Sequence, residues 1–218
     1  MTQIVVFGTG TFAQLVDFYF DIDSDYEIVA FTVDEEHVDS DTAYGRPLVP
    51  FESVTDEYPP DEYDMFVAVG YRELNELREQ KFNEANTKGY DLVSYVNSEI
   101  THWDEMTIGE NCFIFEDQTV QPFVEIGDNV ILWSGNHVGH HSTIGDHCFV
   151  TSHAVISGYV EIGANSFLGV NSTILDEVTL AQKTVVGAGA TIVDDTESGV
   201  YIGPAAERRG DASTDTNL

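Results

Sequence analysis

Basic residues are scarce in this 218-residue sequence, which has three lysines and five arginines against 39 acidic residues, for a formal net charge of −31. A chain with this charge repels phosphate backbones and anionic headgroups, so neither nucleic acid nor a membrane surface is expected as a partner. The acidic residues are spread along the whole chain. This distribution favours a protein hydrated for a halophilic, high-salt host over a docking site for one basic partner.

Long apolar runs are also missing. No stretch of 18 consecutive apolar residues occurs, so no transmembrane helix is expected. The N-terminus, MTQIVVFGTG, has no basic segment ahead of its apolar residues, which argues against a secretory signal peptide. We therefore expect a cytoplasmic protein.

The C-terminal half of the sequence contains a strict six-residue repeat. Aliphatic residues recur every sixth position without a slip: Ile108, Ile114, Val120, Ile126, Leu132, Val138, Ile144, Val150, Ile156, Ile162, Leu168, Ile174, Leu180, Val186 and Ile192. A period of six fits neither a single helix nor a hairpin, and it is typical of a parallel β-helix built from hexapeptides. Three hexads close one coil of 18 residues. We predict a left-handed β-helix of about five coils over residues 101–209.

The fourth position after each aliphatic residue is mostly small, as a narrow prism requires. Cys112 and Cys148, the only cysteines, both occupy it and stand two coils apart. Two coils correspond to roughly 10 Å, too far for a disulfide, so both are expected to be small buried apolar residues. Gln118 and Asn136 break the rule one coil apart, which predicts a stacked pair of buried amides.

Glycine follows the spacing of 18 as well. Gly109, Gly127, Gly145 and Gly163 recur one coil apart, at a corner where a Cβ atom would clash.

The N-terminal segment alternates strands with helices, which predicts a small Rossmann-like α/β domain over residues 1–100. The pattern places strands at 3–8, 27–33, 64–69 and 91–96, a short strand near 47–49, and helices at 11–20 and 73–88, the second closed by Gly89. Residues 210–218 are expected to form a disordered tail.

A glycine-rich turn follows the first predicted strand. Gly8, Thr9 and Gly10 begin a G-x-G-x-x-A sequence, in which backbone N–H groups and a helix N-terminus favour a phosphate. Asp34 ends the second strand, where a carboxylate suits a ribose or sugar hydroxyl, and Arg72 follows the third strand and would meet phosphate. The short domain favours a mononucleotide or nucleotide-sugar over NAD. The alternatives are a tight turn without a ligand and an ion pair between Arg72 and a nearby acid.

Five of the seven histidines lie within seventeen residues: His137, His140, His141, His147 and His153. Gly158 stands one coil beyond His140 and is expected to leave an open space beside the imidazole, as a thioester channel needs. Tyr159 stands one coil beyond His141 and would cover it. His137 is expected at the preceding corner. Histidine suits deprotonation of an amine or hydroxyl near neutral pH, so His140 is the candidate general base.

Two alternatives compete for this cluster. Zinc sites on such prisms pair histidines two coils apart, but Thr101, Asp104, Glu105 and Asp117 stand 36 residues before His137, His140, His141 and His153. No third histidine ligand is in place, so no metal is expected. The other alternative is surface decoration, which we adopt for His147.

Several segments together carry a resemblance: VVFGTGTFA, FVAVGYR, GHHSTIGDHCFVTSHAVISG, the hexad run and the closing VYIGPAAERR. Over residues 1–209 the chain resembles the two-domain sugar acyltransferases of the sialic-acid O-acetyltransferase (NeuD) type, which include bacillosamine-pathway and perosamine N-acetyltransferases. The resemblance implies a homotrimer with acetyl-CoA between neighbouring prisms. It also implies that the N-terminal domain holds a nucleotide-linked sugar through Gly8, Thr9, Gly10, Asp34 and Arg72.

The resemblance further assigns roles within the prism. The catalytic histidine of the family's H-x-x-x-I-G stretch matches His140, with His141 beside it, and His137 and His153 are candidate substrate contacts. Positions lining the acetyl-CoA channel match Gly158, Val170 and Ala188. The terminal turn matches Gly203 and Pro204, and Arg208 and Arg209 would pair with CoA phosphates.

One position departs from the family, because many relatives have an acid where this chain has His141. The group that orients His140 must then come from a neighbouring subunit, from a backbone carbonyl or from His141 itself. The expected function is acetyl-CoA-dependent acetylation of a sugar hydroxyl or amine for surface polysaccharide or glycan synthesis. The alternatives are a serine-type or other small-molecule acetyltransferase, a γ-carbonic-anhydrase-like zinc protein, and a non-catalytic trimeric scaffold.

Overall fold

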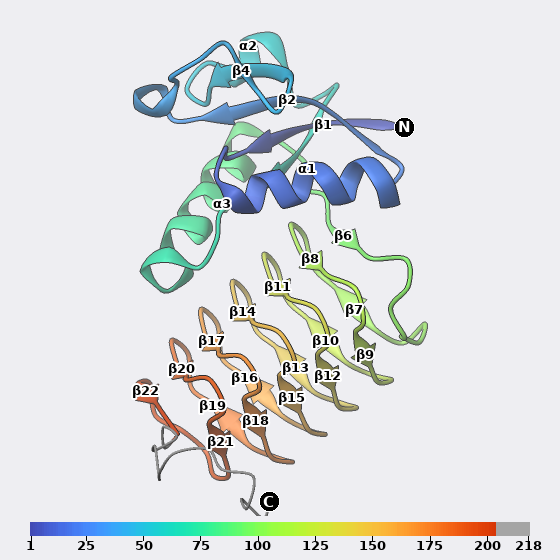
Figure 1. Ribbon diagram of the computed structural model, residues 1–218, viewed down its shortest axis with the longest axis vertical. Coiled ribbons are helices and arrows are strands. Elements are labelled where there is room, and N and C mark those ends of the chain that lie inside the picture. Colours follow the sequence, from blue (N-terminus) through green and yellow to red (C-terminus); the bar gives the residue numbers. More distant parts are fainter. Residues whose placement is uncertain (204–218) are drawn as a thin grey trace, which may run out of the picture.

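The computed structural model of the protein describes residues 1–203. An α/β domain precedes a tall parallel β-helix, and the coils descend from this domain toward the C-terminal end (Figure 1). Each coil has three short strands, and the repeats stack as the hexad spacing predicts. The fold is thus the predicted one, a small Rossmann-like domain followed by a left-handed β-helix.

The N-terminal sheet has the strand order β3-β4-β2-β1-β5. Its strands are β1 (Thr2–Phe7), β2 (Tyr26–Val33), β3 (Thr42–Ala43), β4 (Arg46–Pro50) and β5 (Asp64–Val67). All neighbours pair in parallel except β3 and β4. The helical segments are α1 (Thr11–Asp23), η1 (Glu35–His37), α2 (Val54–Glu57), η2 (Arg72–Asn75) and α3 (Glu76–Lys88). Parallel strands place their carboxyl ends, and the loops that follow, along one edge of the sheet.

Two N-terminal elements differ from the prediction. The helix expected from residue 73 begins at Glu76, because Glu73, Leu74 and Asn75 all have left-handed backbone angles. It ends at Gly89, whose φ of +94° provides the predicted termination. The strand expected over 91–96 is divided: Leu92 forms a bridge to Met65, while β6 (Tyr95–Val96) joins the β-helix.

Three parallel sheets form the faces of the prism. The first has the order β19-β16-β13-β10-β7, with β7 (Thr107–Ile108), β10 (Glu125–Ile126), β13 (Thr143–Ile144), β16 (Glu161–Ile162) and β19 (Thr179–Leu180). The second has the order β21-β18-β15-β12-β9, with β9 (Thr119–Val120), β12 (His137–Val138), β15 (Val155–Ile156), β18 (Thr173–Ile174) and β21 (Thr191–Ile192). The third has the order β22-β20-β17-β14-β11-β8-β6, with β8 (Phe113–Ile114), β11 (Ile131–Leu132), β14 (Phe149–Val150), β17 (Phe167–Leu168), β20 (Val185–Val186) and β22 (Val200–Tyr201).

The interior of the prism follows the hexad pattern. Every repeated aliphatic residue is buried except the first, Ile108, which is half-buried. Cys112 and Cys148 are buried and free. Gln118 and Asn136 are both buried, as predicted, and the backbone N–H of Asn136 donates to the side-chain oxygen of Gln118 at 3.2 Å.

The backbone at the corners of the prism adopts left-handed angles at regular intervals. From residue 111 to residue 189, one residue in every six has a left-handed φ: Asn111, Asp117, Phe123, Asn129, Gly135, His141, His147, His153, Tyr159, Asn165, Asn171, Glu177, Lys183 and Gly189. Asparagine, aspartate and histidine are the non-glycine residues enriched in this conformation. The corner geometry therefore accounts for three of the five clustered histidines without any ligand.

The third sheet docks the N-terminal domain. Helix α1 lies between the N-terminal sheet and the first coils (Figure 1), and the outward side chains Phe113, Ile131 and Phe149 share a core with it. Arg78 of α3 is fully buried in this junction. Its guanidinium donates to the carbonyl oxygens of His147 (2.7 Å), Cys148 (3.1 Å) and Gly70 (3.1 Å). Burial lowers the pKa of Arg78 to about 10.

No helix within residues 1–203 combines the length and apolar character needed to cross a membrane.

Candidate functional site

A pocket of about 640 Å³ opens at the carboxyl ends of β1, β2 and β5. It is lined by the glycine turn, by Asp34 and by Arg72, together with His37 and Tyr71. The structure therefore brings together Gly8, Thr9, Gly10, Asp34 and Arg72, the residues predicted to bind substrate in the N-terminal domain.

The glycine turn has a strict backbone requirement. Gly8 has a φ of +116°, and a Cβ atom there would lie 2.7 Å from the carbonyl oxygen of Ala68. Tyr44 holds the turn from outside, since its hydroxyl donates to the carbonyl oxygen of Thr9 at 2.7 Å. Gly10 is the N-cap of α1, so no capping side chain covers the first N–H groups of the helix. Such a turn suits a phosphate group.

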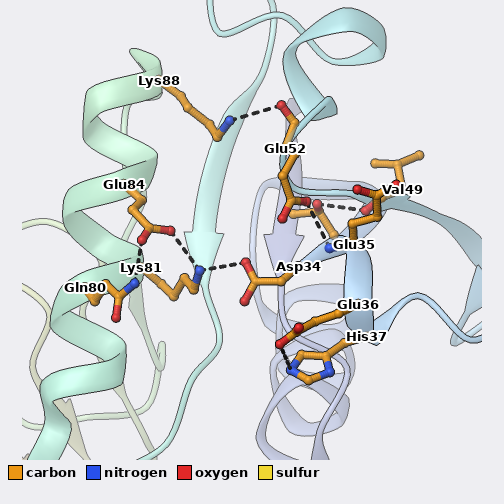
Figure 2. Close-up of polar contacts among 11 residues, drawn as sticks. Asp34, Glu35, Glu36, His37, Val49, Glu52, Gln80, Lys81, Glu84 and Lys88 are labelled. Atoms are coloured by element: carbon orange, nitrogen blue, oxygen red, sulfur yellow. Dashed lines mark hydrogen bonds and ion pairs between the residues drawn. The ribbon is translucent and has the colours of Figure 1, made fainter.

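Asp34 has a partner that the sequence did not reveal. Lys81 of α3 extends across to it, with Nζ 2.6 Å from Asp34 Oδ1 and 2.8 Å from Glu84 (Figure 2). Burial alone would lower the pKa of Lys81, but the hydrogen bonds to the two carboxylates outweigh it and the pKa is raised. The Asp34 carboxylate is thus fixed in place with one oxygen engaged.

Arg72 lies on the rim of the same pocket, on an exposed segment of unusual geometry. No carboxylate pairs with Arg72 in the part of the chain that the structure describes, so the ion-pair alternative receives no support. The three left-handed residues 73–75 follow it directly. Arg78 donates to Asn75 at 3.1 Å, which fixes the turn behind Arg72.

His140 and His141 lie on the edge between the first and second sheets, at the corner that follows β12. The side chains of both are exposed in the single chain. A Cβ atom on Gly158 would lie 2.8 Å from Cε1 of His140. The predicted stacking of Gly158 on His140 is therefore correct, but the expected open space is not there, because the imidazole itself occupies the room that glycine leaves.

His141 packs between two aromatic rings. Its ring is stacked on Tyr159 at 4.8 Å and 17°, as predicted, and lies 4.7 Å from the ring of Phe123. Nδ1 of His141 lies 3.2 Å from Nδ1 of His140. These contacts hold both imidazoles in defined orientations.

The other candidate residues occupy several places. His137 lies in β12 and not at the corner, because its backbone pairs with Thr119 and Val155 in the second sheet. His153 is on a different edge, where its ring covers Gly135.

The candidate cofactor residues are divided between two edges. Val170 and Ala188 are exposed, one coil apart, on the edge between the second and third sheets, whereas Gly158 lies on the His140 edge. Gly203 packs near Ala190. Pro204, Arg208, Arg209 and the tail 210–218 lie outside the described residues.

Within one chain the pocket and His140 are not brought together. Tyr71 on the pocket rim packs on Phe149 and Phe167, with ring centroids 5.0 and 5.2 Å apart, so the pocket borders the third sheet. His140 lies on the edge between the other two sheets, which is opposite to the third sheet in a triangular prism.

Thiol and metal chemistry receive no support from the described residues. Burial raises the pKa of both Cys112 and Cys148 to about 12, so neither thiol is a nucleophile near neutral pH. Residues 1–203 contain no group of three or more histidine, cysteine or acidic side chains placed to hold a metal. The prediction of surface decoration for His147 is wrong: its side chain is largely buried beside Phe82, and burial lowers its pKa.

Two family models match the prism. Residues 123–158 match the bacterial transferase hexapeptide (six repeats), and residues 159–193 match the hexapeptide repeat of succinyl-transferase. The coils over residues 123–193 are therefore hexapeptide repeats.

Solved structures match the whole two-domain arrangement. PerB from Caulobacter crescentus, in complex with CoA and GDP-perosamine, has 24% identity and a TM-score of 0.83, over 96% of this chain and 98% of that one. The acetyltransferase domain of PglB from Neisseria gonorrhoeae FA1090 has 22% identity and a TM-score of 0.78, over 93% and 97%. WeeI from Acinetobacter baumannii AYE has 20% identity and a TM-score of 0.77, over 93% and 97%. At these identities the likeness shows the fold.

Proposed function

We propose that the protein transfers an acetyl group from acetyl-CoA to an amine or hydroxyl of a nucleotide-linked sugar, as the NeuD-type enzymes do, in glycan synthesis in the cytoplasm. The observation that carries this proposal is the pocket in which the glycine turn, Asp34 and Arg72 converge. Its backbone N–H groups and guanidinium suit a diphosphate, and its carboxylate suits a sugar hydroxyl. The similar fold of PerB, solved with CoA and GDP-perosamine, supports the same substrate pair.

The chemistry requires one base and no covalent enzyme intermediate. His140 Nε2 accepts the proton of the sugar amine or hydroxyl as that atom attacks the thioester carbonyl carbon. Backbone N–H groups of the coil stabilise the oxyanion of the tetrahedral intermediate. The C–S bond then breaks, and the CoA sulfur leaves with the proton that His140 releases.

A homotrimer would bring the candidate cofactor residues together, because Gly158 and the pair Val170 and Ala188 lie on two different edges of one chain. The second sheet, bounded by the His140 edge and the Val170 edge, exposes apolar side chains at Val155 (39%), Leu175 (40%) and Val193 (58%). Burying them between prisms would place one chain's His140 and Gly158 near a neighbour's Val170 and Ala188, with acetyl-CoA between them. The expected mass in light scattering is about 72 kDa, three times the chain's 24.1 kDa.

The test is thiol release from acetyl-CoA in molar salt, with a panel of UDP-, GDP-, CMP- and dTDP-amino sugars. One nucleotide-sugar should be acetylated, and His140→Ala should lower turnover by roughly a hundredfold or more while the trimer remains intact. His102→Ala, at an exposed histidine outside the site, is the matched control and should retain full activity. Near-normal turnover by His140→Ala would show that His140 is not the general base.

A further inference from the structure

The contact between His140 and His141 constrains where their hydrogens lie. The two Nδ1 atoms are 3.2 Å apart. A neutral imidazole has one N–H and one lone pair, so a hydrogen bond between two Nδ1 atoms needs a hydrogen on one and a lone pair on the other. The two rings must therefore be opposite tautomers.

The surroundings hold this contact in place. His141 has a left-handed φ of +59°, and its ring is fixed between Phe123 and Tyr159. His140 is fixed by its packing against Gly158 and by its backbone N–H, which donates to Gln121 at 2.9 Å. Neither imidazole can rotate about its side-chain bonds without losing a contact with a packed neighbour.

No carboxylate of the described residues hydrogen-bonds to either imidazole. The carboxylate of Asp176, one coil beyond Gly158, accepts the backbone N–H of Gly158 at 3.0 Å and not an imidazole N–H. The hydrogen-bond partner of His140 Nδ1 within residues 1–203 is thus His141.

We infer that His141 is the positioning residue for His140: its Nδ1 lone pair accepts the Nδ1–H of His140 and so keeps Nε2 of His140 free as the base. The direction of this hydrogen bond rests on the proposed function, because a base at Nε2 needs the hydrogen on Nδ1. When Nε2 takes the substrate proton, the imidazolium still donates through Nδ1 to His141. A neutral ring thereby performs the task that a carboxylate performs in other histidine bases.

The first test does not need a substrate. Long-range ¹H–¹⁵N NMR of the full chain with ¹⁵N-labelled histidine, assigned with His140→Gln and His141→Asn, reports which nitrogen of each ring is protonated. We expect His140 with the hydrogen on Nδ1 and His141 with the hydrogen on Nε2. In His141→Phe, the Nδ1–H signature of His140 should be lost. His140 protonated on Nε2 in the unaltered protein would overturn the inference.

The second test separates hydrogen bonding from packing. His141→Asn supplies an acceptor oxygen, and asparagine tolerates the left-handed backbone of this corner. His141→Phe keeps an aromatic ring, and phenylalanine is already present at the equivalent corner one coil earlier, at Phe123. We expect kcat to stay within about threefold in His141→Asn and to fall tenfold or more in His141→Phe, with KM unchanged in both.

Equal losses in the two variants, or no loss in either, would overturn the inference. Both variants must first show the circular dichroism spectrum and assembly mass of the parent. If the NMR signature is present but no nucleotide-sugar is acetylated, the proton arrangement stands and the proposed function fails.

Discussion

Glycine meets two different physical demands at the residues that form the candidate site. Gly8 is needed for its backbone angle and for its approach to Ala68, both within the N-terminal turn. Gly158 has no left-handed angle and is needed only because the His140 ring lies against it. The first requirement concerns the shape of the pocket, and the second concerns the position of one side chain.

Replacement of Gly158 by alanine tests the second requirement. The added methyl would lie 2.8 Å from Cε1 of His140, closer than carbon atoms approach, so the ring must move away from Gly158. We expect turnover to fall tenfold or more with little change in unfolding temperature, because the backbone angle suits alanine. Thiol-release kinetics and calorimetry measure the two quantities.

Gly199→Ala is the control, because its nearest neighbour outside the adjoining residues would be a ring atom of Tyr201 at 3.8 Å. Full activity in Gly158→Ala would show that His140 does not depend on this packing.

Helix α3 connects the two parts of the molecule through charged side chains that a sequence pattern assigns to solvent. Arg78 and Lys81 lie one turn apart on its inner face, the first buried against the prism and the second against Asp34. The helix has few apolar residues, and its sequence alone does not single out Arg78 or Lys81 as buried. Their partners are backbone carbonyls and a carboxylate distant in sequence, which no local pattern can indicate.

The buried Arg78 yields a prediction at this scale. Arg78→Met removes the donors for four carbonyl oxygens in the junction, and each buried polar group left unpaired costs roughly 1–3 kcal/mol. We expect a large fall in the urea midpoint of the whole chain. Lys183→Met, which breaks an exposed ion pair of α3 with the prism, should change the midpoint little. Equal midpoints for the two variants would contradict this role of Arg78.

Prediction from sequence succeeded where the chain repeats. The spacing of six and of 18 predicted the coils, the buried cysteines, the amide pair and the neighbours of His140 and His141, because a regular prism has one register. It failed at residues 73–75, since a run of left-handed residues without glycine has no compositional signal. It also placed His137 at the corner before Val138, whereas His137 already belongs to β12 and lies two residues after Gly135, the left-handed residue of that corner.

At the scale of the whole molecule, charge is the dominant feature. A net charge of −31 on 218 residues produces self-repulsion, and salt screens it over a distance of about 10 Å at 0.1 M and about 3 Å at 1 M. We expect the unfolding temperature to rise steadily between these salt concentrations. Sucrose at matched osmolality controls for solute effects other than screening. An unfolding temperature independent of salt would contradict the halophilic interpretation.

Strand β6 covers hydrogen-bonding groups at the N-terminal end of the β-helix, where another chain could otherwise pair. It pairs with β8 at the first coil, and Thr101 forms a bridge to β9, so two of the three faces at this end have their hydrogen-bonding groups covered. At the other end, β22 covers β20 in the same way. A stack of parallel strands with bare ends is a template on which further chains can add. Within residues 1–203, the segment leading out of the α/β domain and strand β22 therefore cover hydrogen-bonding groups on which a further chain could add.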